Sequence, residues 1–166
     1  MSIEKAREHL SKFGVENRIV ELPVSSATVE LAAKALGRSP ERIAKTISFY
    51  GSDGGVILIV AAGDAKIDNK RFKERFGLKA KMLAPEDAER LIGHAVGGIC
   101  PFGVNEGVRV FLDVSLKRCE TVFPACGSSN SEIELTCEEL EEYAVPEGWV
   151  DVCKGWAGDA RGESHP

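Results

Sequence analysis

The chain has 166 residues, 43% of them hydrophobic, which suffices for one domain with a sizeable core. Its longest apolar run, VILIVAA at 56–62, is far shorter than the roughly 18–20 residues of a membrane-spanning helix, and the N-terminus MSIEKAREHL lacks the apolar core of a secretory signal. We therefore expect a soluble cytoplasmic protein with no membrane partner. Its net charge of −5, taken alone, argues against a nucleic-acid ligand.

The first half of the chain is predicted to alternate helices and strands. An amphipathic helix begins at a Ser2 cap, places Ala6, Leu10 and Phe13 on one face, and ends at Gly14. The elements predicted next are a strand at 18–22, a helix at 28–37, a helical turn at 39–41, and strands at 43–50 and 56–62. The GSDGG segment between the last two strands indicates a hairpin. Because the second of these strands is apolar on both faces, we expect it at the centre of a sheet.

The second half of the chain is predicted to contain three helices and three strands. They are helices at 68–77 and 85–93, strands at 109–114, 121–125 and 132–136, and a helix at 137–144. Phe72, Phe76 and Leu91 are expected to point inward from the first two of these helices. Thr136 and Glu139 have the spacing of a capping box at the start of the last helix.

The cysteine pattern gives no sign of a disulfide framework or a metal site. The five cysteines are odd in number and lie at positions 100, 119, 126, 137 and 153, with no Cys-x-x-Cys or Cys/His ligand spacing. We therefore expect reduced thiols and no bound metal.

The charges are unevenly distributed along the chain. Residues 66–81 hold seven basic residues and two acidic ones, whereas residues 132–151 hold eight acidic residues and no basic one. Such runs are usually solvated helix faces. The alternative is a basic surface that meets phosphates, with the acidic segment facing away from it.

Lys45 is unusual because it shares a strand face with apolar side chains. Strand side chains alternate between faces, so Lys45 lies on the same face as Ile43, Ile47 and Phe49. One interpretation is a lysine that protects an edge strand, or whose stem reaches out to water. The other is an ammonium at the mouth of a pocket, where partial desolvation strengthens its attraction for an anionic or carbonyl oxygen.

The segment AVGGICPFGV at 95–104 suggests a backbone that comes close to a ligand. Gly97 and Gly98 permit a turn and remove the side chains that would obstruct a ligand, and Pro101 fixes the consecutive N–H groups in a form that suits an oxyanion. The segment is neither a phosphate-binding loop nor a dinucleotide fingerprint. Cys100 has no clear partner base, so structural packing is favoured over a nucleophilic role.

Four segments, in this order and spacing, resemble the YbaK/ProX family of aminoacyl-tRNA editing proteins. They are AKTISF with Lys45, VGGICPFG, FLD ending at Asp113, and CGSSNSEIEL at 126–135. Family members are freestanding relatives of the editing domain inserted in bacterial prolyl-tRNA synthetases, and they hydrolyse amino acids wrongly attached to tRNA, typically tRNA(Pro). The resemblance implies an α+β fold: one domain over 1–153 with a curved, mixed, partly barrel-like sheet and helices outside, followed by a flexible tail at 154–166.

The resemblance also implies roles for the matching residues. Lys45 binds the substrate near its carbonyl and phosphate oxygens, and the N–H groups of Gly97 and Gly98 receive the charge that develops on the carbonyl oxygen. The implied substrate-binding residues are Thr46, Cys100, Pro101, Asp113, Gly127 and Ser128, of which Asp113 and Gly127 shape the cavity and engage the α-amino group. The implied tRNA-binding residues, facing the acceptor stem, are Lys66, Lys70, Arg71 and Lys73. No cofactor is implied, because the ribose 2′-OH beside the ester helps to position or activate a water.

Departures from the family pattern bear on the substrate. The cysteine-specific branch commonly reads Gly-Gly-Ile-Ser-Pro, and Cys100 replaces that serine. The alanine-specific branch has asparagine after the lysine and a histidine in the last loop, whereas this chain has Thr46 and no histidine at 128–130. The Lys-Thr pair is similar to the cysteine-specific branch, whose substrate thiol is proposed to attack its own ester. We therefore expect Cys-tRNA(Pro) as the substrate, with Ala-tRNA(Pro) or another small aminoacyl-tRNA as the alternative.

Two further hypotheses belong to other classes. The absence of a compelling acid, base or nucleophile fits a non-catalytic adaptor that binds tRNA or a prolyl-tRNA synthetase. A small-molecule pocket protein, or a regulator that uses the thiol of Cys100, is the third alternative.

Overall fold

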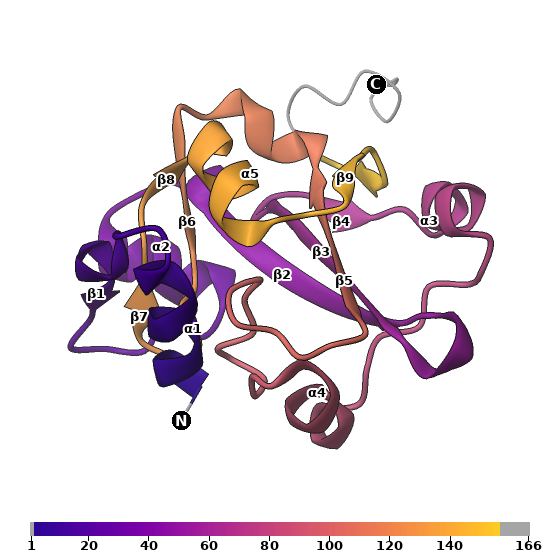
Figure 1. Cartoon of the computed structure of the whole chain (residues 1–166). Helices are drawn as coiled ribbons and strands as arrows, with labels where there is room; N and C mark the ends of the chain where they lie inside the picture. Colours follow the sequence, from indigo (N-terminus) through magenta and orange to yellow (C-terminus); the bar gives the residue numbers. More distant parts are fainter. Residues whose placement is uncertain (1, 157–166) are drawn as a thin grey trace.

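A six-stranded mixed sheet forms the centre of the computed structural model, which describes residues 2–156 (Figure 1). The strand order is β8-β6-β2-β3-β5-β9. The bounds are β2 (Ile43–Tyr50), β3 (Val56–Ala62), β5 (Val108–Asp113), β6 (Thr121–Pro124), β8 (Leu135–Thr136) and β9 (Gly148–Val150). The pairs β2–β3 and β6–β8 are antiparallel, and the other three pairs are parallel. The expected α+β fold with a curved, mixed sheet is confirmed.

Helices lie around the sheet on several sides. They are α1 (Ser2–Ser11), α2 (Val29–Leu36), α3 (Asn69–Phe76), α4 (Pro85–Ile92) and α5 (Cys137–Ala144). In the view of Figure 1, α1 and α2 lie to the left of the sheet, α3 to its right, α4 below and α5 above. Two short antiparallel pairs complete the domain: β1 (Val20–Glu21) with β7 (Ser131–Glu132), and β4 (Lys66–Ile67) with β10 (Cys153–Lys154).

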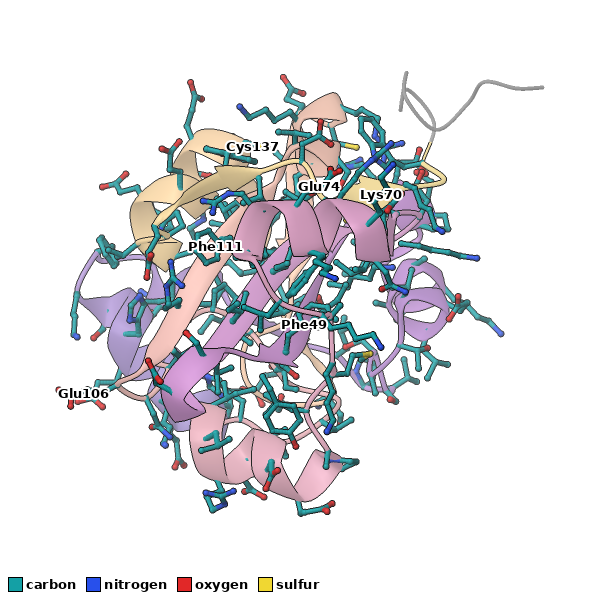
Figure 2. The ribbon with its side chains drawn as sticks, turned by 90° about the vertical axis from the view of Figure 1, so that its right-hand side faces the viewer. Phe49, Lys70, Glu74, Glu106, Phe111 and Cys137 are labelled. Carbon is teal, nitrogen blue, oxygen red and sulfur yellow. The ribbon has the colours of Figure 1, made fainter. Side chains whose placement is uncertain are left out.

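The hairpin of β2 and β3 provides the core of the sheet, as the sequence predicts. Pairing runs from Ala44 opposite Ala62 to Tyr50 opposite Val56, and all seven residues of β3 are buried. α3 covers the face of the sheet that carries Phe49 and Phe111 (Figure 2). Phe72 packs on Phe49 with ring centroids 4.7 Å apart, and Phe76 packs on Phe111 at 5.0 Å. Since odd-numbered residues of β2 face α3, Lys45 lies on this side of the sheet.

Local signals fix the helix ends. The Thr28 hydroxyl accepts a hydrogen bond from the N–H of Leu31 at the start of α2, and Gly37 ends that helix in the left-handed region. The capping box of Thr136 and Glu139 is present at the start of α5. α1 ends at Ser11, and the predicted cap by the Ser2 side chain lies outside what the structure describes.

Two predicted strands are wrong in extent. Residues 132–136 form two short strands, β7 and β8, which pair with different partners because the N–H of Ile133 bonds to Pro124 and turns the chain between them. Only Val20–Glu21 of the strand predicted at 18–22 pairs as a strand, since residues 16–18 form a helical turn. β4, β9 and β10 were not predicted, because strands of two or three residues depend on partners distant in sequence.

The folded chain reaches Trp156. Lys154 pairs with Lys66 in the small β4–β10 sheet, and the Arg118 guanidinium lies 4.9 Å from the Trp156 ring centroid. Residues 157–166, the greater part of the tail predicted from 154, lie outside the described residues.

Candidate active site

A cavity of about 320 Å³ opens where one edge of β2 loses its neighbouring strand. β6 pairs only with Ile43 and Ala44. Further along β2, the carbonyl of Ser48 accepts the N–H of Leu83 (3.2 Å), and the N–H of Tyr50 donates to Lys81 (2.9 Å). The backbone N–H and C=O groups of successive strand residues point to alternate edges. Those of Thr46 therefore point to the same edge as those of Ser48 and Tyr50, in the gap between β6 and residues 81–83. The strand edge therefore offers unpaired backbone groups to the cavity.

The walls of the cavity come from five segments distant in sequence. They are residues 26–29 leading into α2, residues 43–48 of β2, Met82 and Leu83, the loop residues Val96, Gly97 and Ile99, and Ala125 with Glu132. Most of these side chains are apolar. At the rim, Met82 and Val96 are strongly exposed, with 64% and 62% of their surface accessible.

The two adjacent glycines of the loop play different structural parts. Gly97 lines the cavity with a φ of +99°, and within residues 2–156 its N–H donates no hydrogen bond. A side chain on Gly98 would place its Cβ 2.6 Å from the carbonyl carbon of Gly127, so the two loops need glycine there to pack backbone against backbone. The Gly98 N–H donates to the carbonyl of Ala95 at 3.0 Å. The free N–H at the cavity therefore belongs to Gly97.

Lys45 is half-buried and lines the cavity. Its Nζ donates to the carbonyl of Gly63 at 3.4 Å, a long hydrogen bond that leaves most of its donor capacity unused. Burial lowers the pKa of Lys45 below its usual value, and the nearby Cys153, Asp64 and Glu30 oppose that shift. β2 is not an outermost strand of the sheet, but beyond Ala44 its edge away from β3 has no neighbouring strand among the described residues, so Lys45 lies beside a short open stretch of edge.

Two buried polar atoms on the cavity wall have no hydrogen-bond partner among the described residues. They are Oγ1 of Thr46 and Oε1 of Glu132. Glu132 is only 2% exposed, and burial raises the pKa of its carboxyl to about 7. Sequence reasoning missed Glu132 because it was counted with the acidic segment 132–151. In the sequence Glu132 alternates with Glu134 along the predicted strand, so the pattern alone does not separate the buried carboxyl from the exposed one.

Cys100 and Pro101 are buried and do not line the cavity. The Cys100 thiol donates to the carbonyl of Phe102 (3.6 Å) and lies 3.5 Å from Nε2 of His94. Burial raises the pKa of this thiol to about 12. Burial has the opposite effect on His94, whose pKa it lowers. A thiol in this state is a poor nucleophile at neutral pH.

Asp113, Gly127 and Ser128 also lie outside the cavity wall. The buried carboxylate of Asp113 accepts N–H groups from Ser115 (3.0 Å) and Val152 (2.9 Å), so it joins the end of β5 to the chain before β10. The Ser128 hydroxyl bonds within its own loop, to Asn130 and Ser131. Of the residues predicted for the site, the structure thus brings Lys45, Thr46 and Gly97 together at the cavity.

The four predicted tRNA-binding residues lie on β4 and α3. Lys66, Lys70 and Lys73 are exposed, and Figure 2 shows Lys70 on the outer face of α3. Arg71 is half-buried, with its guanidinium bonded to the carbonyl of Cys153 and 3.7 Å from Asp68. Arg71 therefore holds β10 against α3, whereas the three lysines present free positive charge.

The described residues contain no group of three or more His, Cys, Asp or Glu side chains that could hold a metal ion, and the five cysteines are free thiols. None of the helices in that part of the chain is long and apolar enough to cross a membrane.

The structure is a single domain with a cavity beside a strand edge, and comparison with known proteins identifies its class. The model of the aminoacyl-tRNA editing domain matches residues 24–143, which include most of the cavity wall. The chain belongs to this family, whose members are aminoacyl-tRNA deacylases and therefore hydrolases.

Individual relatives agree with this assignment. The chain is 54% identical over 156 residues to "Uncharacterized protein YwhH" of Bacillus subtilis, covering 94% of this chain and 99% of that protein. It is 27% identical over 114 residues to "Putative Cys-tRNA(Pro)/Cys-tRNA(Cys) deacylase EbsC" of Enterococcus faecalis, covering 68% and 70%. A solved structure described as "a putative trans-editing enzyme for prolyl tRNA synthetase" superposes with a TM-score of 0.81 at 28% identity, covering 91% of this chain and 96% of that one.

Proposed function

We propose that the protein is a trans-editing deacylase that hydrolyses the ester of mischarged tRNA, with Cys-tRNA(Pro) as its main substrate. The observation that carries the proposal is the pair formed by the Lys45 ammonium and the free Gly97 N–H on the wall of one small cavity. Both groups stabilise negative charge on oxygen, which is what ester hydrolysis requires. The relatives named for Cys-tRNA and prolyl-tRNA editing support the choice of tRNA.

In this proposal the protein positions and polarises the ester, and the nucleophile comes from elsewhere. The Gly97 N–H donates a hydrogen bond to the carbonyl oxygen as negative charge develops on it. Lys45 binds the ester and phosphate oxygens. Gly98 acts by keeping the loop close to Gly127. With cysteine as the acyl group, the substrate thiol attacks its own carbonyl: the C–S bond forms, the C–O bond to the ribose breaks, and the thiol proton passes to the ribose oxygen. Water then opens the released cyclic thioester to give free cysteine. With alanine, a water beside the ribose 2′-OH attacks instead.

The choice of amino acid rests on the Lys45-Thr46 pair. The mainly apolar cavity of about 320 Å³ admits cysteine and alanine alike. One methylene or hydroxyl changes discrimination by only about 1–3 kcal/mol, so Ala-tRNA(Pro) is the second substrate candidate. The exposed lysines Lys66, Lys70 and Lys73, with Arg71 behind them, are proposed to face the acceptor stem.

A non-catalytic adaptor for tRNA or prolyl-tRNA synthetase is the second candidate function. The observation that favours it is a cavity wall without a cysteine thiol and without a histidine to activate the serine and threonine hydroxyls there. The test is hydrolysis of Cys-tRNA(Pro), Ala-tRNA(Pro) and Pro-tRNA(Pro) by the purified protein against a no-enzyme control. We expect rapid loss of Cys-tRNA(Pro) with Pro-tRNA(Pro) spared. Survival of all three, with tRNA still bound, selects the adaptor.

A further inference from the structure

The cavity contains a buried acid for which neither the fold nor the proposed reaction so far has a use. Glu132 is 2% exposed, and its Oε1 has no hydrogen-bond partner among the described residues. Oγ1 of Thr46, on the wall of the same cavity, is also buried and unpartnered. Leaving a buried polar group unpaired costs about 1–3 kcal/mol, and more for a charged group. Two such atoms in one cavity indicate a ligand that pairs with both.

The surroundings of Glu132 specify the kind of ligand. Burial raises the pKa of its carboxyl, and the only opposing influence is a hydrogen bond with Ser26. No cation of the described residues contributes to this shift. Lys45 lies among Gly63, Asp64 and Cys153 instead. An ionised carboxylate only accepts hydrogen bonds, and a hydroxyl can accept one as well, so the matching ligand group is a cation with several N–H donors.

We propose that Glu132 and Thr46 bind the α-ammonium group of the aminoacyl moiety and thereby restrict the enzyme to esters whose amino group is free. This proposal rests on the proposed function. The α-carbon joins the ammonium directly to the ester carbonyl, and Gly97, the proposed donor to that carbonyl, lies on the wall of the same cavity as Glu132. The ammonium and the developing oxyanion are thus held by two different walls.

Asp113, which the family resemblance associates with the amino group, is not free for this task. Both of its carboxylate oxygens already accept backbone N–H groups, and it does not line the cavity. Glu132 is the acid on the cavity wall with an unused acceptor. Because acylation removes the positive charge and a donor from the amine, the site selects against N-blocked esters, including peptidyl-tRNA.

The test uses two stable ligands that differ only at the amine. These are 3′-alanylamino-3′-deoxyadenosine and its N-acetylalanyl counterpart, whose amide bonds resist hydrolysis. Calorimetry measures the dissociation constant of each for the native protein, Glu132→Gln and Glu134→Gln. Glu134 is the matched control because it is exposed and bonds to Thr121 and Arg42. We expect the native protein and Glu134→Gln to bind the free amine about 10- to 100-fold more tightly than the acetylated ligand, and Glu132→Gln to lose this preference.

Folding of the variant is checked by urea unfolding, where Glu132→Gln is expected to be at least as stable as the native protein at pH 8. Equal affinity of the native protein for the two ligands, an undiminished preference in Glu132→Gln, or no binding of either ligand overturns the proposal. Hydrolysis of Cys-tRNA and Ala-tRNA is measured in parallel. Hydrolysis without amine selectivity refutes the role of Glu132 alone, and amine-selective binding without hydrolysis refutes the deacylase function alone.

Discussion

β3 and the open edge of β2 lie side by side in the same sheet but differ in how completely their polar groups are satisfied. Every residue of β3 is buried and apolar, and the strand is paired with β2 along its whole length and with β5 over residues 56–60. The edge of β2 around Thr46 has no neighbouring strand and faces a cavity with unpartnered polar atoms. The paired centre accounts for stability, whereas the unpaired groups at the edge of β2 are the ones that we propose bind the substrate.

The largest effect is expected at Lys45. Replacing Lys45 with alanine removes the cation at the cavity, and we expect single-turnover deacylation to fall by about 10²–10³, the usual loss for an electrostatic donor to a developing oxyanion. Urea unfolding is expected to change little, because the lost hydrogen bond to Gly63 is long. Lys12→Ala, at an exposed lysine after α1, is the control. An unchanged rate in Lys45→Ala refutes its catalytic role.

A substitution in β3 is expected to lower the stability of the protein and to leave its deacylation rate nearly unchanged. Leu58 is fully buried at the centre of the sheet, so Leu58→Ala should lower the free energy of unfolding by about 2–5 kcal/mol. The rate per folded molecule should remain near that of the native protein, because Leu58 does not line the cavity. The free energy of unfolding and the deacylation rate are measured on one preparation. A change in the first without a change in the second shows that β3 supports stability and not activity.

The pH dependence of stability tests the state of Glu132. The pKa of this carboxyl rises from its usual 4.5 to about 7 on folding, so between these values the folded state binds a proton that the unfolded state has lost. Stability therefore decreases as pH rises from about 4.5 to 7, by roughly 3 kcal/mol. The facing groups are the Ser26 hydroxyl and the thiols of Cys100 and Cys126, whose pKa values burial raises, so these thiols stay neutral in this range.

The measurement is the difference in unfolding free energy between the native protein and Glu132→Gln, followed from pH 4.5 to 8. Glutamine does not titrate, so the difference isolates Glu132. A difference that stays constant across this range shows that the carboxyl is not desolvated.

The smallest effect on function is expected from replacing Lys70 and Lys73, the exposed lysines of α3. Lys70→Ala with Lys73→Ala removes two exposed charges, which should weaken tRNA binding and reduce the salt dependence of the affinity by about 0.7–0.9 per lysine. The rate at saturating tRNA is expected to stay constant. The double variant Lys12→Ala with Lys34→Ala is matched in charge and exposure. If the affinity for tRNA has the same salt dependence in the two double variants, the tRNA does not contact Lys70 and Lys73.

Local chemistry explains which parts of the fold could be predicted from the sequence. The hairpin at 43–62 and the capping box at Thr136 depend on residues close in sequence, and both were predicted correctly. β7 and β8 were merged into one strand, because their separation depends on a bond from Ile133 to the distant Pro124.

The site could be predicted only in part, for the same reason. Lys45 was found because a cation on an apolar strand face conflicts with its surroundings, and Gly97 because glycine pairs permit unusual backbone. Glu132 was missed, since its burial arises from elements that meet only in the fold. Asp113 and Cys100 have the right residue types for a site, but their partners show that they hold the backbone and the core together.

The central claim is that the unpaired polar groups along β2 serve the substrate at no benefit to the fold, and Thr46→Val tests it most directly. Valine has nearly the shape of threonine and removes only the hydroxyl whose Oγ1 is buried and unpartnered. Unfolding free energy and single-turnover deacylation of Cys-tRNA(Pro) are measured on the same protein. We predict unchanged or higher stability with a rate reduced about tenfold. A loss of stability with an unchanged rate would contradict the claim.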